Sequence, residues 1–113
     1  MQRLNSVNPE NATGRQKELL DTVESAFGMV PNTAKVMANS TAVLESFLAF
    51  SQAMGNTAIG EKLHNQVKLS TSESNSCDYC TSILSAVAPS AGLSAEDILA
   101  GRTGNSDDRR TKV

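Results

Sequence analysis

Cys77 and Cys80 are the residues whose type and spacing most directly indicate chemistry, and the chain has no other cysteine. We expect a helix to begin near Cys77. A spacing of three then places both sulfurs on one side of its first turn, close enough to form a disulfide. Unpaired N–H groups and the positive end of the helix dipole stabilise a thiolate, which is the reactive form of cysteine. The pair therefore predicts a redox-active dithiol.

Two other interpretations of the cysteine pair stay open at this point. A structural zinc site takes four ligands, and His64, the single histidine, is the one further Cys or His side chain that could contribute. Alternatively, the two thiols are structural or inert. Spacing alone does not exclude either interpretation.

The cellular compartment bears on this choice. Residues 1–13 lack the apolar core of a signal peptide, and every apolar run is far shorter than the roughly 20 residues that span a bilayer. We therefore expect a cytoplasmic protein that does not associate with a membrane. In a reducing compartment a C-x-x-C pair is more often redox-active or metal-binding than structural.

Composition favours one small helical domain. The 113 residues include three Phe, one Tyr and no Trp, whereas a sheet protein would use more aromatic and β-branched residues. The net charge of −2 gives no basic surface for nucleic acid. Basic residues near the end of the chain, Arg102 among them, are mixed with Asp107 and Asp108, so we interpret this segment as a solvated tail.

Apolar periodicity predicts four helices in the first two-thirds of the chain. The first covers residues 14–27 and ends at Gly28, and a short second helix covers 32–38 after Pro31. The third is capped by Ser40 or Thr41 and stops at Gly55-Asn56, and the fourth runs from about 59 to 72.

Two further helices follow a break in the polar stretch before Cys77. The fifth should be capped by Ser76 or Asp78 and should end or kink at Pro89. The sixth is short, with Ser94 as its N-cap and Asp97 three residues later.

Residues 101–108 are expected to form a loop. Another helix is expected to begin at Asp107, just before the chain ends at Val113. A compact domain rarely ends on the first turn of a helix, so we expect either that this last segment is truncated or that its native partner is missing.

Four stretches carry a family resemblance: Phe27–Asn32 (FGMVPN), Met37–Glu45 (MANSTAVLE), Asn75–Cys80 (NSCDYC) and Ala91–Ile98 (AGLSAEDI). In this order the chain resembles the alkylhydroperoxidase D/carboxymuconolactone decarboxylase superfamily over roughly residues 9–113. It looks like the C-x-x-C branch with an N-terminal helical extension. The resemblance implies an N-terminal arm (1–13), the helical extension (14–55) and the C-x-x-C core (56–113).

The resemblance implies an all-α helical bundle with about six helices per subunit, assembled as a homo-oligomer (a trimer or hexamer). It also implies an antioxidant peroxidase that reduces organic hydroperoxides or disulfides through a redox-active disulfide. A thiol or protein dithiol would regenerate the cysteine pair, and no organic cofactor or metal is implied.

Site residues are carried over position by position. Cys80 resembles the peroxidatic cysteine, which becomes a sulfenic acid, and Cys77 resembles the partner that then closes the disulfide. The family places a glutamate twelve residues before the first cysteine and a histidine four residues after the second. Here those positions hold Asn65 and Leu84, neither of which can exchange a proton near neutral pH.

Other residues could supply the missing proton relay. Glu61 lies one helical turn before Asn65, His64 is its neighbour, and Glu73 is four residues before Cys77. Each is otherwise a surface residue.

The fourth and fifth helices are expected to pack so that Asn65, Cys77, Cys80 and Leu84 face one small pocket. In this arrangement we interpret Leu84 mainly as core packing beside the cysteines. Tyr79 would be a packed ring with an exposed hydroxyl.

Two alternative functions remain. The substitutions at Asn65 and Leu84 favour a catalytically degenerate oligomeric scaffold that keeps the helices of the family without its chemistry. A carboxymuconolactone decarboxylase-like enzyme is the third candidate, but such enzymes do not need the cysteine pair.

Overall fold

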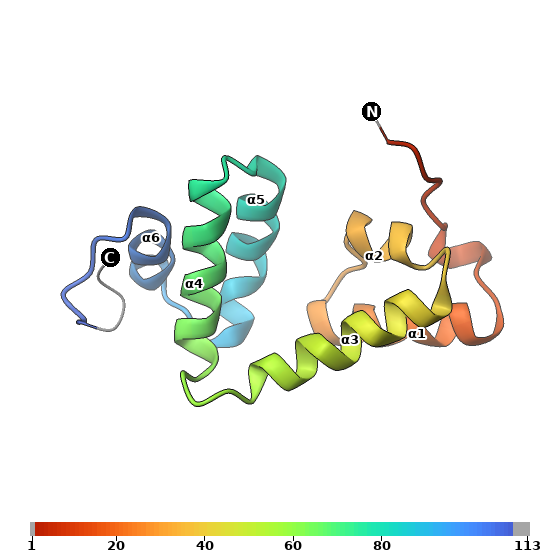
Figure 1. Cartoon of the computed structure of the whole chain (residues 1–113), viewed down its shortest axis with the longest axis horizontal. Helices are drawn as coiled ribbons and strands as arrows, with labels where there is room; N and C mark the ends of the chain where they lie inside the picture. Colours follow the sequence, from red (N-terminus) through yellow and green to blue (C-terminus); the bar gives the residue numbers. More distant parts are fainter. Residues whose placement is uncertain (1, 110–113) are drawn as a thin grey trace. The chain divides into compact units, whose positions relative to one another are not determined.

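The computed structural model describes residues 2–109. Within that range the protein contains six α-helices and two short 3-10 helices and has no strand (Figure 1). This confirms the all-α class and the expected number of helices. The chain divides into two compact units, Met1–Met54 and Gly55–Val113.

The first unit is built from three α-helices, α1 (Gly14–Phe27), α2 (Asn32–Met37) and α3 (Thr41–Gly55), preceded by η1 (Pro9–Asn11). As predicted, α1 ends at Gly28, which has a φ of 72° and donates its N–H to the carbonyl of Glu24. Glycine adopts this left-handed conformation without the steric cost that a Cβ would bring.

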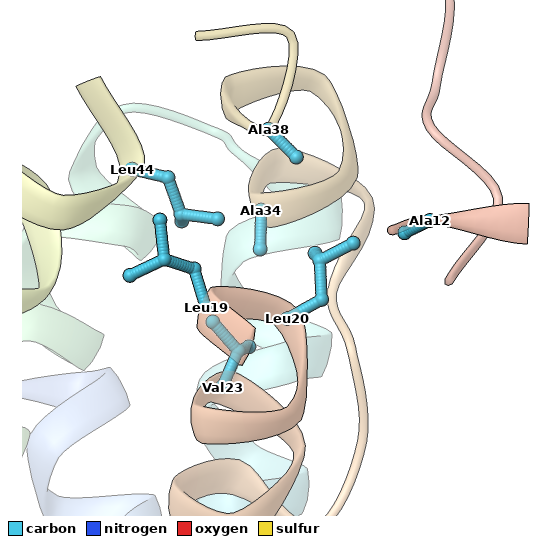
Figure 2. Packing of buried hydrophobic residues seen from close by; sticks show 7 residues of the cluster. All are labelled: Ala12, Leu19, Leu20, Val23, Ala34, Ala38 and Leu44. Carbon is cyan, nitrogen blue, oxygen red and sulfur yellow. The ribbon is translucent and has the colours of Figure 1, made fainter. Parts of the chain in front are cut away.

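The core of the first unit joins all three of its α-helices (Figure 2). The buried side chains are Ala12, Leu19, Leu20, Val23, Ala34, Ala38 and Leu44. The small alanines on and just after α2 allow the larger leucines to fill the space between the helices. The predicted N-terminal arm (1–13) is held against this unit, because the Val7 N–H donates to the carbonyl of Lys35 at 3.0 Å.

The second unit contains α4 (Glu61–Ser74), α5 (Asp78–Val87), η2 (Ala88–Ala91) and α6 (Ala95–Thr103). Helix α4 contacts both α5 and α6 and lies between them (Figure 1). A small apolar core forms around Leu69 of α4, Ala88 of η2 and Leu93, against which Leu84 and Ile98 pack. This core fixes α5 against α4.

Several predicted boundaries are confirmed by local backbone chemistry. Helix α5 ends at Val87, two residues before Pro89, and the chain continues as the 3-10 turn η2. Helix α6 begins with the predicted capping box, in which Ser94 and Asp97 each accept the backbone N–H of the other.

The predicted loop over 101–108 is wrong at its start, because α6 continues through Thr103 and ends at Gly104. Gly101, the first residue of the predicted loop, lies inside α6 and is buried against α4. A Cβ at Gly101 would lie 3.2 Å from the Cα of Gln66, so glycine serves close helix packing there. Residues 107–109 form a bend and turn rather than a helix, and 110–113 lie outside the described residues.

Helix α6 is tied to α4 by polar contacts as well as by packing. The Lys62 ammonium lies 2.7 Å from the Asp97 carboxylate, and the Gln66 side chain donates to the carbonyl of Asp97 at 3.1 Å. The hydrogen bond from Lys62, followed by that from the Ser94 backbone, lowers the pKa of Asp97 below its ordinary value.

Across residues 2–109, every helix falls short of the length and apolar character required to cross a membrane.

The lowered pKa of Asp97 predicts an acid-dependent loss of stability. A carboxyl whose pKa is lower in the folded protein contributes stability above its unfolded pKa and loses it as the pH falls through the folded value. We expect Asp97→Asn to lower the thermal stability at neutral pH, and the curves of wild type and variant to converge below about pH 4. Circular dichroism melting of the full chain across this range measures the effect.

Glu96→Gln is the matched control, because Glu96 is an exposed carboxylate in the same first turn of α6. It should change the melting temperature less than Asp97→Asn. A difference between wild type and Asp97→Asn that persists undiminished in acid would contradict the role given to the carboxylate.

Candidate redox site

Cys77 and Cys80 are joined in the structure at the beginning of α5. Their sulfurs lie 2.17 Å apart and their Cα atoms 5.3 Å apart, and the Cα distance falls inside the range that disulfides span. Cys77 is the N-cap residue of α5, and Cys80 lies in the first turn of the helix. The sequence-based expectation that both sulfurs share that turn is confirmed.

The cap of α5 differs from the prediction. Neither Ser76 nor Asp78 caps the helix. Instead the Cys77 Sγ accepts the backbone N–H of Cys80 at 3.3 Å. A sulfur in this position meets the N–H groups that the first turn of a helix leaves without intrahelical partners.

The turn between α4 and α5 places Cys77 beside the end of α4. Ser76 has a φ of 52°, a left-handed conformation that costs a non-glycine residue roughly 1–2 kcal/mol. The Cys77 N–H then donates back to the carbonyl of Ser72 at 2.9 Å, and the Ser76 N–H donates to that of Glu73. Two hydrogen bonds to α4 therefore fix the position of the first cysteine.

A polar cleft of about 470 Å³ opens beside Cys77. One of its walls carries an ion pair in which the Arg102 Nε of α6 donates to the Glu73 carboxylate of α4. The lining residues are Glu73, Ser76, Cys77, Asp78, Thr81, Ser82, Ser85 and Arg102. Of the four residues expected to share a pocket, Cys77 lines this cleft, and Asn65, Cys80 and Leu84 are not among its lining residues.

Cys77 and Cys80 differ in this respect because they belong to different faces of α5. Thr81 and Ser85 follow Cys77 at intervals of four and line the cleft. Cys80 is followed at the same interval by Leu84, which packs against the apolar core of the unit. The interpretation of Leu84 as core packing is thus confirmed. Tyr79, between the cysteines, is 41% exposed.

Three of the expected relay residues, Asn65, Glu61 and His64, lie along α4 away from its cysteine end. Asn65 is buried, and its side-chain amide donates to the carbonyl of Glu61 at 2.9 Å. Glu61 is exposed and His64 is half-buried. About 13 Å of helix separates Asn65 from the end of α4 at Ser74. Glu73, the remaining relay candidate, is the one that reaches the cleft.

Sequence reasoning missed Arg102, which it placed in a solvated tail. Because α6 continues past Gly101, Arg102 lies in the last turn of a packed helix and lines the cleft. A basic residue in the last turn of a helix, shortly before a glycine, was the available signal.

Within residues 2–109, no three side chains of His, Cys, Asp or Glu lie together as a metal-binding group.

The chain was compared with protein-family models, with curated proteins and with solved structures, and none of these comparisons gave a significant match. The resemblance to the alkylhydroperoxidase D superfamily therefore stays a prediction from the sequence.

Ser85 yields a stability prediction for the cleft. Its Oγ is buried and has no hydrogen-bond partner among the residues that the structure describes. Ser85→Ala removes that hydroxyl and raises helix propensity, so we expect the free energy of unfolding to stay unchanged or to rise by about 1 kcal/mol. Urea denaturation measures the change.

Ser82→Ala is the control, because Ser82 is exposed on the same helix and reports the propensity gain alone. Destabilisation by Ser85→Ala that Ser82→Ala does not share would show that the hydroxyl has a stabilising partner.

Proposed function

We propose that this protein is a thiol-dependent peroxidase or disulfide reductase that cycles Cys77 and Cys80 between dithiol and disulfide. One observation carries the proposal: the two sulfurs are within bonding distance at the N-terminus of α5, at the edge of an open polar cleft. A helix N-terminus favours the thiolate, and the cleft gives a small substrate access to it. The resemblance to alkylhydroperoxidase D supports the same chemistry.

The proposed cycle balances without an organic cofactor. A thiolate attacks one oxygen of a hydroperoxide, the O–O bond breaks, and the sulfur becomes a sulfenic acid while an alcohol leaves. The second thiol attacks that sulfur, water leaves, and the disulfide forms. An external thiol or protein dithiol then restores both thiols by exchange. With a disulfide substrate, the first step gives a mixed disulfide instead.

Proton transfer is where the protein departs from the family pattern. The carboxylates that line the cleft are Glu73 and Asp78, and Glu73 is already engaged with Arg102. We propose that Glu73 and solvent in the cleft handle the protons that the usual glutamate and histidine would handle. Turnover is then slower than with a dedicated relay, because general acid–base catalysis typically contributes about 10²–10⁴-fold.

Assembly into a homo-oligomer in the cytoplasm belongs to the same proposal. Helix α3 exposes three large apolar side chains at helical spacing, Val43 (51%), Phe47 (40%) and Phe50 (64%). Exposed apolar side chains clustered on one helix are typical of interaction surfaces, which supports association between copies.

A catalytically degenerate scaffold is the second candidate, favoured by the positions that replace the family relay. Asn65 satisfies its amide within α4, and Leu84 packs into the core. Both side chains therefore serve the helical framework. In this case the cysteine pair would not turn over.

Peroxide treatment of the reduced protein tests the proposal directly. We expect hydrogen peroxide or cumene hydroperoxide to consume both thiols and to give a chain that is lighter by two hydrogen atoms and carries no intermolecular disulfide, because the structure joins Cys77 to Cys80 of the same chain. Dithiothreitol should restore both thiols. Intact-mass spectrometry and thiol alkylation measure the change.

Cys77→Ser and Cys80→Ser are the controls, since neither can form the internal disulfide. If both thiols of the wild-type protein remain open to alkylation after peroxide, the peroxidase proposal is overturned in favour of the scaffold.

A further inference from the structure

We propose that Cys77, rather than Cys80, is the cysteine that attacks the substrate, and that Cys80 resolves the intermediate. This order is the reverse of the one that the family resemblance implies. It rests on the proposed function, because it assigns the roles of the two sulfurs within that chemistry.

Access to the cleft is the first observation. Cys77 lines the cleft together with Thr81 and Ser85 of the same helical row, and Cys80 is not among the lining residues. Cys80 instead lies one helical turn before Leu84, which packs against the apolar core. Both cysteines are half-buried, but a substrate that enters the cleft meets Cys77, because that cysteine is the one that lines it.

Hydrogen bonding is the second observation, and it is independent of access. The Cys77 Sγ occupies the N-cap position and accepts the Cys80 N–H at 3.3 Å. In the reduced protein the same N–H donates to a Cys77 thiolate, at the positive end of a ten-residue helix. Cys80 supplies this donor and lies inside the helical turn.

Charge in the cleft does not reverse this preference. Glu73 and Arg102 are paired with each other, so Asp78 is the remaining charged side chain that lines the cleft. Its carboxylate disfavours a nearby thiolate. The N–H donated to Cys77 counters that effect at the sulfur itself, because a hydrogen bond to a charged acceptor is about twice as strong as a neutral one.

The resulting steps balance. The Cys77 thiolate attacks the outer oxygen of the hydroperoxide, the O–O bond breaks, and the alkoxide leaves with a proton as the alcohol. Cys77 is now a sulfenic acid. The Cys80 thiol attacks the Cys77 sulfur, and the hydroxyl leaves as water with the thiol proton. The structure contains this disulfide and an intact α5 together, so the step is compatible with the folded helix.

Single-cysteine variants test the order. Cys80→Ser keeps Cys77, and Cys77→Ser keeps Cys80 with a serine at the N-cap, a residue that caps helices well, so both variants should fold. Each is treated with hydrogen peroxide and a sulfenic-acid trap such as dimedone, and the adduct is followed over time. We expect Cys77 to be labelled faster than Cys80 by about tenfold, which is the effect of one charge-assisted hydrogen bond.

The wild-type protein provides a second measurement that needs no variant. Reduced protein is treated with less than one equivalent of iodoacetamide, and peptide mapping locates the alkylated cysteine. We expect the label mainly on Cys77. A label mainly on Cys80, or faster trapping on Cys80 in the variants, overturns the order.

Failure of the order is distinguishable from failure of the function. If peroxide closes the disulfide in wild type but the label falls on Cys80, the redox function stands and the order is wrong. If neither cysteine is oxidised by peroxide, the peroxidase function and the order within it are both wrong.

Discussion

The turn that joins α4 to α5 is the constraint on which the site depends. Ser76 adopts a left-handed conformation, and the N–H of Cys77 returns to the carbonyl of Ser72. This arrangement brings Cys77 to the N-cap of α5, where its sulfur accepts the N–H of Cys80. Helices α4 and α5 pack against each other, and this packing holds the short connection between them, including the strained Ser76, in one conformation.

The cleft is formed by the packing of the helices of the second unit against one another. Its lining comes from the end of α4, the first two turns of α5 and the last turn of α6. Helix α4 positions the other two helices, through Leu69 in the apolar core on one side and through Lys62 and Gln66 on the other. Glu73 and Arg102 reach the same cleft for this reason, although they are far apart in sequence.

Features that depend on a few neighbouring residues could be predicted from the sequence. Gly28 ends α1, Pro89 limits α5, and Ser94 with Asp97 caps α6. Each of these follows from local backbone chemistry. The shared turn of the two cysteines is local in the same sense, because a spacing of three is fixed by helix geometry.

Features that depend on packing between helices could not be predicted in the same way. Gly101 and Arg102 were assigned to a loop and a tail, because their sequence neighbours do not reveal that α4 packs against this segment. The pocket expected around Asn65 and Leu84 followed the family pattern. In this chain Asn65 is satisfied within its own helix and Leu84 belongs to the core.

The central claim is that the two sulfurs act as one reversible two-electron couple. Equilibration of the full chain in glutathione buffers of graded redox poise, followed by acid quenching and alkylation, tests it most directly. A single reversible transition is predicted, in which Cys77 and Cys80 lose and regain their thiols together. Independent oxidation of the two cysteines, or mixed disulfides with glutathione that never resolve into the internal bond, would contradict it.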